Sequence, residues 1–291
     1  MMKTLIMTKN HFRILQFTDI HMMYESTDQE TYLLMNKAIK DNHPDLIVIT
    51  GDLTMTHNNE GLLKELRDFL DHYQIPWTFV FGNHDHEAIL SLSEQADILM
   101  KGKYCFFDKG NPNISGCGNH YLQVIKNKNI IALLGFLDSH NDRIDIINGE
   151  KIWSYDYIDQ SQIDDAINTV ENLKETYPDF SSLFFFHIPL TEYKTKIDTD
   201  RNDILGSCFE PISCSKYDSH FFEQLIKTNT LKGIFAGHDH VCDFSFEQDG
   251  CLLAFGRCTG HYNYTMPEFQ KGARVIDINQ DGSILSYIYL E

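Results

Sequence analysis

The sequence lacks any apolar run that approaches the roughly 18 residues needed to cross a bilayer. The apolar part of its first residues is also too short for a secretory signal peptide. Its seven cysteines are odd in number, scattered, and contain no CxxC pair. In a chain of this size that pattern favours reduced thiols over a disulfide framework. These absences predict a cytoplasmic protein with no membrane partner.

Positive charge is scarce as well. The chain has 24 Lys and Arg residues against 42 Asp and Glu residues, a formal net charge of −18. Such an acidic protein has little affinity for the phosphates of nucleic acids, so a nucleic-acid partner is not expected. A small positive site is still compatible, because bound cations can override the local charge. Without repeats or linker-like tracts, the 291 residues predict one domain spanning residues 1–291.

The first hundred residues alternate between two kinds of pattern. Residues 12–17, 46–50 and 77–81 are short runs rich in β-branched and aromatic side chains, typical of buried strands. Residues 31–40 and 62–70 carry apolar side chains at helical spacing. This β-α-β-α-β order predicts an α/β fold with a parallel sheet covered by helices.

The pattern changes after residue 100. A helix is expected over residues 160–177, and residues 194–216 are polar and irregular, typical of a long functional loop. Further strands are predicted over residues 103–107, 121–125, 130–136, 182–186, 232–236, 243–247, 251–255, 274–278 and 284–289.

Side chains that can bind metals follow five of the predicted strands. They are Asp19, His21, Asp52, Asn83, His84, His187, His238 and His240. Taken singly, each is more typical of an ordinary loop or turn. Jointly they recur at successive carboxyl ends, which a parallel sheet places along one edge and within reach of a common point. The sequence therefore predicts a metal site at that edge.

The kinds of side chain narrow the choice of metal. Carboxylates, imidazoles and an amide oxygen favour Mn, Fe or Zn over the ions that thiolates select. In residues 19–21 and 238–240 the candidate ligands are two apart, which in an extended segment would put both side chains on one side. Asp52 is the best-placed residue to bridge two cations about 3.5–4 Å apart, the separation of two-metal phosphoester sites.

Five motifs occur along the chain in a recognisable order. They are Asp19-Ile20-His21, Gly51-Asp52, Gly82-Asn83-His84-Asp85, His187 and Gly237-His238-Asp239-His240. In these motifs and their order the sequence resembles the calcineurin-like metallophosphoesterase superfamily. The resemblance implies a four-layer α/β/β/α sandwich of two mixed sheets flanked by helices, with the metal site at the C-terminal strand ends. It also implies a hydrolase of phosphoric esters that uses a dinuclear metal centre and metal-activated water.

The resemblance further implies a role for each motif residue. The first metal would be held by Asp19, His21 and His240. The second would be held by Asn83, His187 and His238, with Asp52 as the bridge. His84 would be the general acid or a transition-state stabiliser, and Asp85 would orient it. The cofactors would be two divalent or trivalent transition-metal ions, and the partner a small phosphorylated substrate.

Two positions depart from the purple acid phosphatase branch of the superfamily. Met55 stands where that branch has a tyrosine ligand, and His21 where it usually has glycine, so a tyrosinate-coloured iron site is not expected. Many phosphodiesterase members have an aspartate at the position of Met55, so monoesterase and diesterase activities both stay open. A non-catalytic scaffold is disfavoured by His84, and a nuclease by the net charge of −18.

Several polar loop residues outside the motifs are weaker candidates for contacts with phosphate or a leaving group. They are Arg201, Arg257, His261 and Tyr262. Cys242 and Cys258 are predicted to be small core residues. Substrate specificity is expected to lie in residues 101–119, 194–216 and 257–269.

Overall fold

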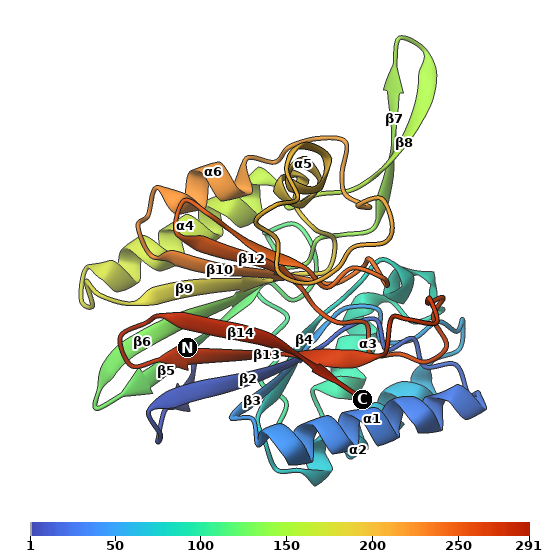
Figure 1. The fold of residues 1–291 in the computed structure, drawn as a ribbon, viewed down its shortest axis with the longest axis horizontal. Helices are drawn as coiled ribbons and strands as arrows, with labels where there is room; N and C mark the ends of the chain where they lie inside the picture. Colours follow the sequence, from blue (N-terminus) through green and yellow to red (C-terminus); the bar gives the residue numbers. More distant parts are fainter. Residues whose placement is uncertain (1) are drawn as a thin grey trace.

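The computed structural model describes residues 2–291 and contains two large sheets packed face to face (Figure 1). One sheet has five strands in the order β14-β13-β2-β3-β4, and the other has seven in the order β1-β5-β6-β9-β10-β12-β11. Helices α1, α2 and α3 cover the first sheet, and α4, α5 and α6 cover the second. The predicted four-layer α/β/β/α sandwich is therefore confirmed.

The elements alternate along the chain as the sequence patterns predict. The strands are β1 (Lys3–Ile6), β2 (His11–Phe17), β3 (Leu46–Thr50), β4 (Trp77–Val80), β5 (His120–Lys126), β6 (Asn129–Phe136), β7 (Asp142–Ile147), β8 (Glu150–Tyr155), β9 (Ser181–Phe185), β10 (Leu231–Ala236), β11 (Ser245–Gln248), β12 (Cys251–Phe255), β13 (Gly272–Asn279) and β14 (Ile284–Leu290). The helices are α1 (Ser26–Asn42), α2 (Glu60–His72), the 3-10 helix η1 (His84–Glu87), α3 (Leu92–Leu99), α4 (Gln160–Lys174), α5 (Thr191–Thr199) and α6 (Phe221–Ile226).

Both sheets are mixed. β2 pairs parallel with β3 and β3 with β4, as the β-α-β order predicts, whereas β13 runs antiparallel to β2. In the second sheet, β9 and β10 are parallel neighbours. Because β2, β3, β4, β9 and β10 point the same way within their sheets, the loops after them are the natural place for a shared site.

Apolar packing fixes the two sheets against each other and against their helices. The layer between the sheets includes Val48 and Phe185, both fully buried. A second layer lies beneath α1, α2 and α3 and includes Met35 and Leu66. A third lies beneath α4, α5 and α6 and includes Phe221. None of the helices in the described part of the chain is long and apolar enough to cross a membrane.

Two of the predicted stretches differ in the structure. Residues 103–107 form only a single bridge, from Cys105 to Trp77, so the strand predicted there is wrong. Residues 194–216 begin inside helix α5, which the sequence did not reveal because this helix buries only Tyr193 and Ile197. The rest of that segment is irregular and follows the prediction.

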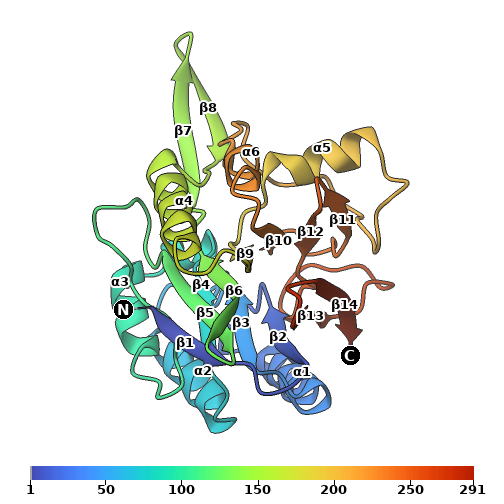
Figure 2. The same ribbon diagram turned by 90° about the vertical axis from the view of Figure 1, so that its left-hand side faces the viewer.

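A hairpin formed by β7 and β8 was not predicted. It projects from the body of the protein as a two-stranded arm (Figure 2). The signal was present, because the Asn148-Gly149 pair is a favoured two-residue hairpin turn. Ile144 and Ile146 alternate with charged residues before that turn, which is the strand pattern that should have been recognised.

The buried His120 should make the free energy of unfolding depend on pH in the acid range. Its ring is buried, stacks on Phe136 at 4.8 Å, and places Nε2 2.7 Å from Thr78 Oγ1. Burial lowers the pKa of His120 to about 4. The unfolded chain, with a histidine pKa of about 6.5, therefore binds a proton between about pH 6.5 and 4 that the folded chain does not. This group should reduce the free energy of unfolding by about 3 kcal/mol as the pH falls through that window.

The measurement is urea unfolding of the wild type and His120→Gln at pH 7.5, 6 and 5. The variant should be less stable at pH 7.5, where it has lost the packing of the ring. Its stability should then fall less steeply with acid than that of the wild type, because glutamine binds no proton. Parallel pH profiles would contradict the assignment to His120.

Candidate metal centre

The loops after the strands bring seven predicted residues together. Two donor groups are formed, each with its ligand atoms within 4.8 Å of one another. The first donor group is Asp19, His21, Asp52 and His240. The second donor group is Asp52, His187 and His238. Asn83 adjoins the second, with Oδ1 3.0 Å from His187 Nε2.

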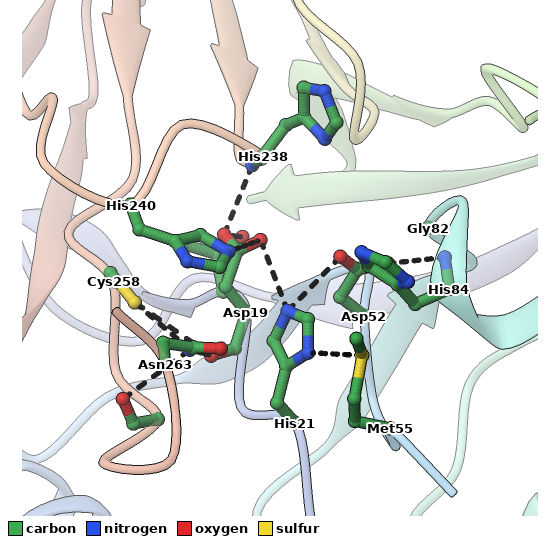
Figure 3. Close-up of polar contacts among 12 residues, drawn as sticks. Asp19, His21, Asp52, Met55, Gly82, His84, His238, His240, Cys258 and Asn263 are labelled. Atoms are coloured by element: carbon green, nitrogen blue, oxygen red, sulfur yellow. Dashed lines mark hydrogen bonds and ion pairs between the residues drawn. The ribbon is translucent and has the colours of Figure 1, made fainter. Parts of the chain in front are cut away.

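Asp52 belongs to both donor groups. Its Oδ2 lies 3.1 Å from His21 Nε2 in the first and 3.3 Å from His187 Nε2 in the second. Asp19 Oδ1 lies 3.4 Å from His240 Nε2, and His238 Nδ1 lies 3.1 Å from His187 Nε2. His238 and His240 thus serve different groups although they are only two residues apart. Figure 3 shows Asp52 between His21 and His84, with Asp19 and His240 beside them.

The backbone at these residues is not extended. The expectation that ligands two residues apart would lie on one side of an extended segment is therefore wrong. Asp19, His21, Asp52 and His238 have φ values of 52°, 44°, 54° and 82°. Only a few per cent of non-glycine residues adopt this left-handed region, and such conformations concentrate at functional sites. The side chains are therefore aimed by sharp turns after the strands rather than by strand alternation. That is why His238 and His240 point into different groups.

Gly82 makes room for the shared carboxylate. A Cβ at this position would collide with the side chain and the backbone nitrogen of Asp52. The other oxygen of Asp52, Oδ1, accepts a hydrogen bond from the backbone N–H of His84 at 3.0 Å. The Gly-Asn-His turn therefore fixes the orientation of the carboxylate that the two groups share.

Burial and opposite charges together set the protonation of both donor groups. Burial alone would lower the pKa of His21 and His187, but the charge of Asp52 outweighs it and raises them to about 9 and 10. Burial would raise the pKa of Asp52, yet the facing histidines hold it well below its usual range. Burial and the positive charge of His187 lower the pKa of His238 to about 3. Protons on His21 and His187 thus balance the carboxylates, and cations can replace those protons.

The donor atoms fit a pair of metal ions. Five buried atoms from the two groups have no hydrogen-bond partner among the described residues: Asp19 Oδ1, His21 Nε2, Asp52 Oδ2, His238 Nε2 and His240 Nδ1. Buried polar atoms without partners are rare and costly, and an ion is one of their ordinary explanations. Carboxylate oxygens, imidazole nitrogens and the Asn83 amide are suitable ligands for Mn, Fe or Zn.

His84 lies beside the donor groups without joining either. Its ring centroid is 5.3 Å from that of His21, and its side chain is partly exposed to solvent. Its Nδ1 lies 2.9 Å from Glu87 Oε1 within the 3-10 helix η1. A carboxylate at Nδ1 favours the N–H form there and leaves Nε2 as the atom that can exchange a proton with a ligand.

The predicted contact between Asp85 and His84 is wrong. Asp85 Oδ1 accepts hydrogen bonds from the backbone N–H groups of Leu53 and Thr54, and Oδ2 accepts one from Gly82. Burial and the charge of Asp52 raise the pKa of Asp85 to about 7. Its carboxyl group therefore ties the loop after β3 to the loop after β4, and the carboxylate that lies at His84 Nδ1 is that of Glu87. The i,i+3 spacing of His84 and Glu87 was the available signal.

Two of the weaker candidates, Arg257 and His261, are engaged elsewhere. The Arg257 guanidinium donates to Asp243 Oδ2 at 2.6 Å and packs over the ring of Phe269. The backbone N–H of His261 donates to Thr31 Oγ1, and its Nε2 lies 3.1 Å from Glu291 Oε2. These contacts hold the C-terminal end of the chain in place. These contacts explain Arg257 and His261 as structural residues.

A disulfide links Cys208 to Cys242, so the expectation of free thiols is wrong for this pair. Cys242 follows His240 by two residues, and Glu210 accepts a hydrogen bond from the backbone N–H of Val241 at 2.8 Å. The segment around residue 208 is thereby fastened to the loop that carries His238 and His240. Cys258 is fully buried with a free thiol, as predicted.

A sandwich with two donor groups that share one carboxylate at its strand ends has the layout of a metallophosphoesterase. A family model described as calcineurin-like phosphoesterase matches residues 12–242, and the chain belongs to that family.

Comparisons with individual proteins agree with this family. The chain is 30% identical to probable inactive purple acid phosphatase 29 of Arabidopsis thaliana, over 92% of this chain and 77% of the relative. It is 29% identical to phosphatase DCR2 of Saccharomyces cerevisiae, over 86% of this chain and 47% of the relative.

Two solved structures share the fold. One is GAP50, described as the anchor in the inner membrane complex of Plasmodium, with a TM-score of 0.60, 13% identity, and coverage of 97% of this chain and 85% of that one. The other is a dimetal phosphatase from Danio rerio, with a TM-score of 0.52, 11% identity, and coverage of 97% and 100%.

Proposed function

We propose that the protein is a dinuclear-metal hydrolase of phosphoric esters. The observation that carries the proposal is the Asp52 carboxylate, which lies within 3.3 Å of a histidine in each donor group and has an unpartnered buried oxygen. Asp19, His21 and His240 would hold one ion, and Asn83, His187 and His238 the other. When bound, the ions would supply Lewis-acid activation of water and positive charge for the phosphoryl oxygens.

The remaining chemistry belongs to the chain's own residues. His84 Nε2 would give its proton to the leaving-group oxygen, with Glu87 holding the ring through Nδ1. Asp85 would keep the loops after β3 and β4 in register, so that Asp52 and His84 stay in contact. The substrate would be a small phosphorylated molecule, because the net charge of −18 disfavours long polyanions.

A second candidate is a metal-binding scaffold without catalysis. The names of three Arabidopsis relatives favour it, since each is called a probable inactive purple acid phosphatase. His84 favours the enzyme instead, because a scaffold has no need of a proton donor at the mouth of the site.

One assay separates the two candidates. The chelator-treated protein is tested on 4-nitrophenyl phosphate and bis(4-nitrophenyl) phosphate after addition of Mn²⁺, Fe²⁺ or Zn²⁺. The proposal expects at least one ester to be hydrolysed with at least one metal, and the activity to disappear again on chelation. Failure to hydrolyse either ester with any metal, in protein that has taken up the ions, would favour the scaffold.

A further inference from the structure

The β7–β8 arm carries an uncovered apolar face. Directly paired residues of an antiparallel ribbon share a face, and the register places Ile144 opposite Trp153 and Asp142 opposite Tyr155. Ile144, Ile146 and Trp153 are therefore on one face, and their side chains are 61%, 73% and 47% exposed. A group of exposed large apolar side chains on such a projection is typical of a surface that binds a ligand or another protein.

The opposite face of the arm is anchored to the body of the protein. The Arg143 guanidinium donates hydrogen bonds to Asp145, on the same strand, and to Asp156, which follows β8. It also lies over the rings of Tyr157 and Tyr217, at 5.0 and 5.5 Å from their centroids. The Lys216 ammonium also donates a hydrogen bond to the backbone carbonyl of Trp153 at 2.7 Å. A free two-stranded hairpin is marginally stable at best, and these contacts together hold the base of the arm in a fixed orientation.

The apolar face continues into the metal centre through two aromatic rings. The Tyr155 ring packs edge-on against the ring of His238, with centroids 4.4 Å apart. The Trp153 ring packs edge-on against Tyr155 at 4.8 Å, and its indole N–H donates to Asp142 Oδ2 at 2.7 Å. We call Tyr155 and Trp153 the aromatic ladder. It runs from the second donor group to the solvent.

We propose that the aromatic ladder binds the organic group of the substrate and selects phosphoesters of planar, uncharged aromatic alcohols. The inference rests on the proposed function, because it needs the phosphoryl group at the donor groups to place its substituent beside His238. Aromatic side chains recognise planar rings by stacking and edge-to-face contact. Asp142 lies on the same face as the ladder, and its negative charge opposes anionic substituents such as further phosphates.

The kinetic test compares an aromatic with a small aliphatic substrate in Trp153→Ala. The substrates are 1-naphthyl phosphate and glycerol 2-phosphate, or their methyl diesters if the enzyme cleaves diesters. Loss of one aromatic contact should raise KM for the naphthyl ester by about fivefold to tenfold with little change in kcat. KM for the glycerol ester should not change. Trp153→Phe keeps a ring and should recover most of the lost affinity.

Leu285→Ala is the matched control, because Leu285 is a 58% exposed apolar side chain on β14 of the other sheet. It should alter KM for neither ester. If Trp153→Ala changes both esters equally, or neither, the ladder does not select the substrate and the inference is wrong. Wild-type protein that hydrolyses no ester overturns the proposed function itself, and the inference with it.

A binding measurement tests the ladder without turnover. Trp153 is half exposed, while the other tryptophan, Trp77, is buried, so a ligand on the ladder should change the emission of Trp153. Benzylphosphonate added to Zn²⁺-loaded protein should give a saturable change that is lost in Trp153→Phe, and methylphosphonate should give none. A shift of oligomeric state in Trp153→Ala on size-exclusion chromatography would instead mean that a second copy covers this face, which overturns the inference.

Discussion

Asp52→Asn is expected to abolish catalysis and metal binding together. Asparagine has the same shape, but it removes the charge that faces His21 and His187 at 3.1 and 3.3 Å. Both donor groups lose the shared negative charge, and the neutral amide keeps only one oxygen that can bind a cation, so the metal content should fall well below that of the wild type. A two-metal site supplies several kcal/mol of transition-state stabilisation, and kcat/KM should therefore fall by on the order of 10³-fold.

Asp277→Asn is the matched control for this variant. Asp277 is also a buried carboxylate, but it accepts two hydrogen bonds of 2.7 Å from Arg13 near the opposite end of β2. Its loss should lower the melting temperature and leave the metal content unchanged. Metal analysis by mass spectrometry, together with kinetics on the ester identified above, compares the two variants. Full turnover and full metal content in Asp52→Asn would place the bridge elsewhere.

His84→Ala is expected to separate proton transfer from metal binding. The His84 side chain lies outside both donor groups, and its backbone N–H can still donate to Asp52 Oδ1 in the variant. Metal content should therefore be retained. General acid catalysis contributes about 10²–10⁴-fold, so kcat should fall by that order for an alkyl phosphate. It should fall much less for 4-nitrophenyl phosphate, whose leaving group departs without a proton.

Glu87→Gln and Asp85→Asn together test which of the two carboxylates orients His84. Glutamine keeps a hydrogen-bond acceptor near Nδ1 but removes the charge, so kcat for the alkyl phosphate should fall by about 10-fold with metals and folding intact. Asp85→Asn should mainly lower the melting temperature, because it weakens three backbone contacts. Equal rates for the wild type and His84→Ala on alkyl and aryl esters alike would move the acid role to another residue.

The sequence by itself determined which residues lie near one another in the metal centre. Asp19, Asp52 and Asn83 follow buried apolar runs, and the carboxyl ends of such strands in an α/β sheet share one edge. Local patterns also predicted most of the strands and helices, because strand and helix periodicities depend only on neighbouring side chains. The family resemblance that the motifs carry implied the four-layer sandwich, which the structure confirms.

Only the tertiary structure decided which hydrogen bonds and covalent links join the residues around the site. Asp85 and Glu87 both adjoin His84 in sequence, and only the packing of the loops after β3 and β4 assigns Asp85 to backbone N–H groups and Glu87 to the histidine. Likewise, the pairing of Cys208 with Cys242 depends on two segments meeting in space.

The left-handed turns at the strand ends were equally out of reach of sequence patterns. Strand alternation predicted that the side chains of His238 and His240 would lie on the same side of the chain. The turns instead direct them into different donor groups. The aromatic ladder likewise needs the anchored position of the arm beside His238. Residue type and local spacing select the chemistry of a site, but the aim of each side chain depends on backbone angles and on contacts between distant segments, which only the folded chain fixes.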